Sequence, residues 1–208
     1  MKSLEKYCLK IILVLFLIIS YSITAQTKKL LILGDSISAG YGIKESENWV
    51  NLLEASLKRN NFDIEIINSS VSGDTTLGGL FRIKNDLSEY SPDYVLVELG
   101  GNDALRGYPI NKIKSNLLKI IDASFAAKAN PVIMQIRIPP NYGKNYVVAF
   151  ESIYSQIAEE KNIPMLTFLL EKVALDKSLM QLDGIHPNQK AQQIIANQVE
   201  KELSLILK

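Results

Sequence analysis

The 208-residue chain is poor in the side chains that bind metals or form disulfides, with one cysteine, one histidine and one tryptophan. A single cysteine excludes an internal disulfide and a cysteine-cluster metal site. A single histidine excludes zinc motifs that need two, such as H-E-x-x-H. Charge of one sign is also lacking, since 23 Lys and Arg face 22 Asp and Glu, which argues against nucleic acid as the main partner. Chemistry that needs an imidazole has one candidate, His186.

The N-terminal segment has the layout of a secretory signal peptide. Three lysines lie within the first ten residues, and an unbroken apolar run of nine residues, 11–19, follows them. Small and polar residues come next, which suits cleavage after Ala25. A retained membrane anchor is the alternative, but a spanning helix needs roughly 17–25 apolar residues. We therefore expect residues 1–25 to be removed and the protein to be exported to the periplasm or the cell exterior.

Residues 26–208 are expected to form a single domain. Loss of the leader removes Cys8, the only cysteine. An exported protein without thiols cannot rely on disulfides, so its stability must come from a packed core. No repeat, low-complexity tract or linker divides this segment, which is of one-domain size.

Short apolar runs alternate with helical patterns along this domain. The expected strands are 29–33, 63–67, 93–99, 131–138 and 164–167, and the expected helices include 49–57, 77–87 and 147–161. Ile113, Leu117, Ile121 and Phe125 recur every four residues and indicate a further amphipathic helix. A last helix is expected to begin near Pro187, since proline is favourable at the first helical position. Such alternation is typical of an α/β domain with a parallel sheet of about five strands between two helical layers.

Small and polar residues gather where the expected strands end. They are Gly34-Asp35-Ser36 after the first strand, 68–74 after the second, 100–103 after the third, and 183–187 before the last helix. In parallel α/β sheets, ligands bind beyond the carboxyl ends of the strands. This edge of the sheet is therefore the expected functional site.

These residue types suit acyl transfer by a serine. The hydroxyl of Ser36 needs a base to take its proton, and His186 is the only imidazole. Asp183, three residues earlier, can hold one ring nitrogen so that the other faces the serine. The backbone N–H groups of Ser36 and Gly73 and the side-chain amide of Asn102 are candidate donors to a developing oxyanion.

The same motifs resemble a known family. Gly34-Asp35-Ser36, Gly73, Gly100-x-Asn102-Asp103 and Asp183-x-x-His186 resemble the four blocks of the SGNH (GDSL) hydrolases. Longer stretches, at 30–42, 68–75, 97–107 and 183–188, are similar to the bacterial periplasmic acyl-thioesterase, lysophospholipase and arylesterase subgroup. The resemblance extends from about Lys29 to Leu207.

The resemblance implies a three-layer, flavodoxin-like α/β/α fold with strand order 2-1-3-4-5. It implies a triad of Ser36, Asp183 and His186, and an oxyanion hole of Ser36, Gly73 and Asn102. It further implies substrate-binding residues beside the acyl site, namely Leu105, Arg106, Gly107, Tyr108 and Pro109. The expected substrate is a small-molecule acyl ester or thioester, with no metal or organic cofactor and no nucleic acid. The expected protein is a monomer that meets membranes only through a lipid substrate or an uncleaved leader.

Other functions remain open at this point. A carbohydrate O-acetylesterase would share the triad and differ in its pocket, whereas a non-catalytic extracellular binding protein would not need the four polar residues together. A phosphate-binding loop is disfavoured because no Gly-x-Gly-x-x-Gly and no P-loop Lys-Ser/Thr is present. A magnesium-dependent phosphotransferase would use Asp35 with Asp74 or Asp103, although each is also a suitable turn residue.

Overall fold

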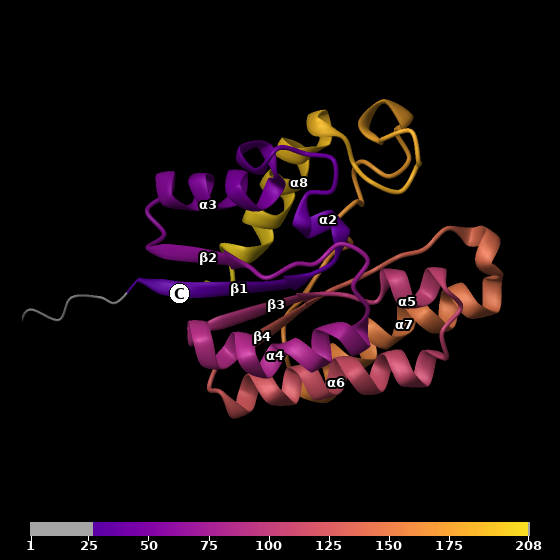
Figure 1. Cartoon of the computed structure of the whole chain (residues 1–208), viewed down its shortest axis with the longest axis horizontal. Helices are drawn as coiled ribbons and strands as arrows, with labels where there is room; N and C mark the ends of the chain where they lie inside the picture. The colour runs from indigo at the N-terminus through magenta and orange to yellow at the C-terminus, as the bar shows by residue number, and fades with distance from the viewer. Residues whose placement is uncertain (1–26, 208) are drawn as a thin grey trace, which may run out of the picture.

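Five parallel strands form one sheet at the centre of the structure, a computed structural model that describes residues 27–207 (Figure 1). The strands are β1 (Lys28–Gly34), β2 (Ile64–Asn68), β3 (Tyr94–Glu98), β4 (Asn130–Met134) and β5 (Met165–Leu166). Their order is β2-β1-β3-β4-β5, and every neighbouring pair is parallel. The predicted α/β fold class and strand order are confirmed. The expected signal peptide lies outside the described residues.

Helices cover both faces of this sheet (Figure 1). They are α2 (Ser36–Ala39), α3 (Trp49–Arg59), α4 (Thr76–Tyr90), α5 (Gly101–Leu105), α6 (Ile110–Ala126), α7 (Lys144–Lys161) and α8 (Gln189–Leu203), with short 3-10 turns η1 (Glu45–Glu47), η2 (Pro140–Tyr142) and η3 (Lys177–Leu179). Successive side chains of a strand point to opposite faces. Leu30 and Ile32 of β1 accordingly pack with α3 and α8, while Leu31 and Leu33 pack with α4, α6 and α7.

The close packing of α4 on the sheet depends on a glycine within the helix. A side chain at Gly79 would collide with that of Leu99, just after β3. Glycine in a helix interior costs roughly 0.5–1 kcal/mol relative to alanine, and here that cost permits the close approach. On the opposite face of the sheet, Trp49 is fully buried and belongs to the core.

Two details of the predicted helices were wrong. Phe125 is 45% exposed, although Ile113, Leu117 and Ile121 are fully buried. A four-residue step overshoots one helical turn by about 40°, so three steps rotate Phe125 away from the core. The last helix begins at Gln189 rather than at the proline, and the side chain of Asn188 caps it by accepting from the Lys190 N–H.

The loop before α8 is held by a backbone bridge. Pro187 pairs with Met180 in an isolated antiparallel bridge, outside the helix.

The fourth strand is shorter than predicted, because it ends at Met134 instead of Ile138. Ile136 and Ile138 are still buried, which explains why the apolar pattern continues past the strand.

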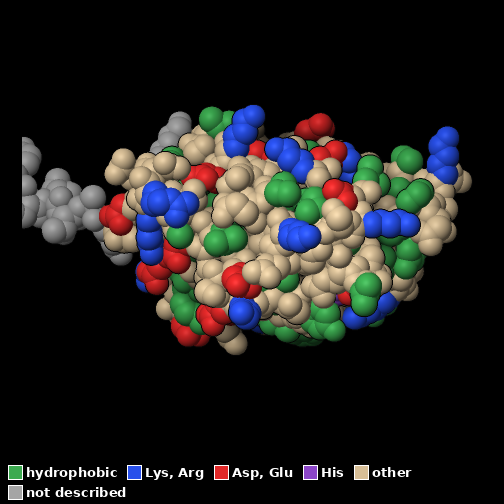
Figure 2. Space-filling view, turned by 90° about the horizontal axis from the view of Figure 1, so that it is seen from above, with side chains coloured by type: hydrophobic (Ala, Val, Ile, Leu, Met, Phe, Trp, Pro, Cys, Tyr) green, Lys and Arg blue, Asp and Glu red, His purple; other side chains and the backbone are tan. Residues whose placement is uncertain are grey.

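The surface shows no large patch of one charge on the face seen in Figure 2, where acidic and basic side chains are interspersed. Among residues 27–207, no helix combines the length and the apolar character that crossing a membrane requires.

Candidate active site

Ser36 lies at the carboxyl end of β1, where it is the first residue of the short helix α2. The loop between β5 and α8 approaches the same end of the sheet (Figure 1) and carries Asp183 and His186. His186 Nε2 lies 2.8 Å from Ser36 Oγ, and His186 Nδ1 lies 2.7 Å from Asp183 Oδ2. The structure therefore places all three residues of the sequence-predicted triad in one chain of hydrogen bonds.

The carboxylate of Asp183 fixes the role of each imidazole nitrogen. Its Oδ1 accepts hydrogen bonds from the backbone N–H groups of His186, at 3.0 Å, and Ile185, at 2.9 Å. These bonds, led by that of the His186 N–H, together with the nearby imidazole, lower the pKa of Asp183 to about 2. An ionised carboxylate only accepts hydrogen bonds, so Nδ1 carries a proton. In the neutral imidazole, Nε2 is then free to accept from the Ser36 hydroxyl.

Two residues outside the predicted site brace the histidine. The Tyr41 ring is tilted over the imidazole, with ring centroids 4.5 Å apart. The Gln181 N–H donates to His186 O at 2.7 Å, and its side-chain amide donates to Tyr41 O at 2.8 Å. Sequence reasoning missed both contacts, although Tyr41 stands in the Gly-Tyr-Gly stretch that follows the Ser36 motif.

The three candidate oxyanion donors come from segments that follow three adjacent strands. In the described part of the chain, neither the Ser36 N–H nor the Gly73 N–H has a hydrogen-bond acceptor. Gly73 has φ +79°, a conformation that side chains rarely adopt, and only Arg106 Nη2, at 3.9 Å, lies near the place where a Cβ would stand. Asn102 Nδ2 donates to Asp35 Oδ2 at 3.1 Å, which leaves its second hydrogen free for another acceptor.

The remaining strand-end aspartates already have partners. Asp74 Oδ2 pairs with Arg82 Nε at 2.9 Å. Asp103 accepts from Thr76 N at 2.8 Å and from Thr76 Oγ1 at 2.7 Å, while burial raises the pKa of its carboxyl. Within the described residues, His, Cys, Asp and Glu form no group of three that could hold a metal ion. These contacts fit structural roles for both aspartates.

The predicted substrate-binding segment runs from α5 to the start of α6. Leu105 packs partly against the core, while 106–109 are exposed. Arg106 Nη2 donates to Gly73 O at 3.2 Å, so the segment is tied to an oxyanion candidate. The Tyr146 hydroxyl, from α7, donates to Tyr108 O at 2.8 Å. The segment thus joins the Gly73 loop to α7.

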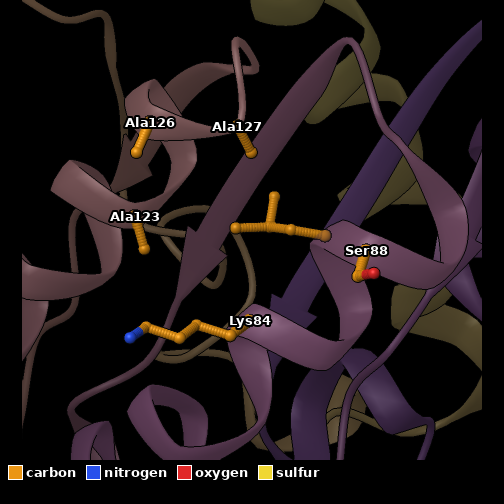
Figure 3. Close-up of a pocket in the computed structure, with 6 residues that line it drawn as sticks. Lys84, Ser88, Ala123, Ala126 and Ala127 are labelled. Carbon is orange, nitrogen blue, oxygen red and sulfur yellow. The ribbon is translucent and has the colours of Figure 1, made fainter.

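A separate hollow of about 320 Å³ lies between α4 and α6 (Figure 3). It is lined by Lys84, Leu87, Ser88, Ala123, Ala126 and Ala127. None of these is a residue of the Ser36 site, and the lining holds no nucleophile paired with a base. The chemistry is therefore assigned to the edge of the sheet and not to this hollow.

A parallel α/β sheet that carries a Ser–His–Asp chain of hydrogen bonds at its carboxyl edge defines the class of α/β serine hydrolases. Residues 32–194 match the sequence profile of the GDSL-like lipase/acylhydrolase family. The chain belongs to that family, the SGNH hydrolases, and is an ester or thioester hydrolase.

Similar proteins span nearly the whole chain. An arylesterase of Vibrio mimicus is 46% identical over 191 residues, which cover 92% of this chain and 95% of that protein. Thioesterase 1/protease 1/lysophospholipase L1 of Escherichia coli K12 is 44% identical over 91% of this chain and 89% of its own. The crystal structure of the psychrotrophic esterase EstA from Pseudoalteromonas sp. superposes with a TM-score of 0.84 at 42% identity, covering 86% of this chain and 98% of that one.

Proposed function

We propose that this hydrolase cleaves acyl esters or thioesters through an acyl-enzyme on Ser36. The observation that carries the proposal is the 2.8 Å contact between Ser36 Oγ and His186 Nε2, combined with the 2.7 Å contact of Nδ1 with Asp183. Nucleophile, base and orienting carboxylate then stand in the order that acyl transfer needs. The route requires no metal or organic cofactor, because the side chains supply every proton transfer.

In the acylation step, Ser36 Oγ bonds to the acyl carbonyl carbon as His186 Nε2 takes the hydroxyl proton. The carbonyl oxygen becomes an oxyanion that the Ser36 and Gly73 N–H groups and the Asn102 amide would stabilise. The tetrahedral intermediate then expels the alcohol or thiol, which leaves with the proton from His186. The negative charge of Asp183 stabilises the imidazolium formed on the way.

In the deacylation step, water takes the place of the leaving group. His186 Nε2 accepts a proton from water as its oxygen bonds to the acyl carbon. The intermediate expels Ser36 Oγ, which recovers its proton from His186. A free carboxylic acid is released, and the enzyme returns to its starting state.

We assign a medium or long acyl chain to the substrate, and place it along Leu105–Pro109. Two observations support this choice: a relative that covers 91% of the chain is named a thioesterase and lysophospholipase, and this segment contacts the Gly73 loop. A carbohydrate O-acetylesterase of the same family is the competing assignment. A series of p-nitrophenyl esters from C2 to C16 separates them. We expect kcat/KM to peak above C4, whereas a sharp optimum at acetate would favour the O-acetylesterase.

The nucleophile itself is tested by covalent labelling. A fluorophosphonate probe should add one phosphonyl group per molecule, with loss of fluoride, and peptide mass spectrometry should place it on Ser36. Ser88→Ala, which removes an exposed serine of the α4–α6 hollow, is the matched control and should label fully. Labelling of another serine, or none at all, would contradict the proposal.

We further propose export of the mature domain, with residues 1–25 as the cleaved leader. The support is the basic segment and apolar run at the N-terminus. The intact mass of the protein recovered outside the cytoplasm should correspond to a chain that begins near Gln26. A full-length mass in that fraction would contradict cleavage.

A further inference from the structure

A second carboxylate, that of Asp35, lies between the nucleophile and an oxyanion candidate. Asp35 is only 5% exposed. Oδ1 accepts from the Ile37 N–H at 3.0 Å, and Oδ2 accepts from Asn102 Nδ2 at 3.1 Å. The two bonds use both carboxylate oxygens and fix the rotation of the group. The proposed acyl-transfer steps assign Asp35 no role, although it immediately precedes Ser36.

We propose that Asp35 is the positioning residue of the oxyanion hole: it holds one amide hydrogen of Asn102 and thereby directs the other toward the developing oxyanion. The inference rests on the proposed function. A primary amide is planar, so fixing one N–H direction also fixes the second. Ser36 lies between Asp35 and Ile37, so the start of α2 presents the Ser36 N–H. The carboxylate of Asp35 therefore links this helix start to the side chain of Asn102.

A hydrogen-bonded layer beneath the site holds Asp35 in place. Glu98 Oε2 accepts from the Asp35 N–H at 3.3 Å and from Ser38 Oγ at 2.7 Å. Glu98 is 2% exposed, and burial raises the pKa of its carboxyl well above the usual range. The nearby carboxylate of Asp35 also raises the pKa of Glu98. The backbone of Asp35 is fixed from β3, and its side chain from α2 and α5.

The charge on Asp35 makes it a suitable acceptor for the amide. Burial raises the pKa of Asp35 to about 6, and the nearby carboxylate of Asp74 also raises it. The Ile37 N–H, His186 and the Asn102 amide act in the opposite direction. Asp35 is thus ionised at neutral and alkaline pH. Hydrogen bonds to a charged acceptor are about twice as strong as neutral ones, so the Asn102 amide is held firmly where the enzyme would act.

A double-mutant cycle tests whether Asp35 acts through Asn102. Asparagine at position 35 keeps an oxygen that can cap α2, because Asn and Asp are equally good N-caps, but it offers an N–H to Asn102. We expect Asn102→Ala to lower kcat for a p-nitrophenyl ester by about 10²–10³-fold, as loss of one oxyanion donor does. Asp35→Asn should lower kcat by about 10-fold or more with KM changed less than about threefold.

The decisive comparison is between the single and double variants. If Asp35 acts through Asn102, Asp35→Asn in the Asn102→Ala background should lower kcat by less than about threefold, since coupled residues are not additive. Inhibition by an alkylboronic acid, which forms a tetrahedral adduct with serine, should weaken in parallel with kcat. Multiplicative losses in the double variant, or full kcat in Asp35→Asn, would overturn the inference.

Two further variants keep the test interpretable. Asp35→Ser retains a good N-cap and removes the acceptor for Asn102, so it should show the same loss of kcat if Asp35→Asn fails to fold. Asp122→Asn, an aspartate of α6 that pairs with Lys161, is the matched control and should retain wild-type kcat. The proposed function fails separately, through an active Ser36→Ala variant, whereas additivity in the cycle affects only the role of Asp35.

Discussion

His186 Nε2 lies 2.8 Å from Ser36 Oγ, although 150 positions separate the two residues in the chain. The parallel sheet produces this contact, because the segment after β1 and the loop before α8 meet at its carboxyl edge. Each residue is held locally, Ser36 at the start of α2 and His186 by the turn that Asp183 caps.

Replacement of His186 by alanine should remove the base without a substitute. It is the only histidine in the chain, so no neighbouring imidazole can take its place. We expect kcat/KM for a p-nitrophenyl ester to fall on the order of 10³-fold or more, and fluorophosphonate labelling of Ser36 to slow comparably. Retention of wild-type rates in either assay would refute the assignment of the base.

Asp183→Asn should impair catalysis far more than folding. The side-chain amide at position 183 of this variant can present an N–H to His186 Nδ1 and so favour the wrong tautomer. A loss on the order of 10³-fold or more in kcat is expected.

Since the pKa of Asp183 is about 2, its ionisation should contribute no step to the pH profile of the wild-type enzyme above pH ~4. The ionised carboxylate of Asp183 stabilises the folded protein at pH values above the pKa of Asp183 in the unfolded chain. This stabilisation is lost as pH falls toward 2, and solvent screening keeps it small because the carboxylate is exposed. Thermal unfolding at pH 7 within a few degrees of wild type is expected, and a wild-type kcat in this variant would exclude Asp183 from the triad.

Asp35→Asn should change how stability depends on pH. The folded-state pKa of about 6 lies above the unfolded value of 3.8. Between these values the unfolded chain loses its proton first, so Asp35 destabilises the native state increasingly from pH 4 to 6 and fully above 6. Two pKa units correspond to about 3 kcal/mol at most. We would measure the free energy of unfolding in urea at pH 4, 5, 6 and 7.5. Relative to wild type, the free energy of unfolding of the variant should rise by about 1–3 kcal/mol over this range. If the difference between the two proteins does not change with pH, burial does not raise the pKa of Asp35.

Gly73→Ala tests the Gly73 N–H as an oxyanion donor. The φ of +79° should cost about 1–2 kcal/mol of stability with any side chain, and we expect a methyl group beside this N–H to hinder the approach of an acyl oxygen. Gly143→Ala is the matched control, because its φ is +93° with no atom near a new Cβ. We expect both variants to be destabilised, but only Gly73→Ala to lose tenfold or more in kcat/KM. Equal activity in the two would argue against an oxyanion role for Gly73.

The sequence alone was sufficient to predict the motifs at the strand ends. The strand order followed from the family resemblance of those motifs. Local patterns could find Ser36 or the Asp183–His186 turn because their neighbours in sequence are also their neighbours in space. Phe125 was misassigned because an apolar repeat every four residues does not specify which face of the helix each residue occupies. Pro187 was misassigned because a proline near a helix does not specify the first helical residue.

Contacts between distant segments could not be predicted in the same way. Glu98 and Asp35 are 63 positions apart, and Gln181 and Tyr41 are 140 apart. Each pair forms because the fold brings two distant segments together, and nothing in either local motif indicates its partner. The layer that supports the site therefore became visible only in the folded chain.

The most direct test of the account is the turnover of Ser36→Ala on a p-nitrophenyl ester, measured on protein whose circular dichroism and thermal unfolding match wild type. If Ser36 is the nucleophile, kcat should fall on the order of 10³-fold or more, because His186 and the oxyanion donors remain but no acyl-enzyme can form. A Ser36→Ala protein that turns over near the wild-type rate would contradict the central claim.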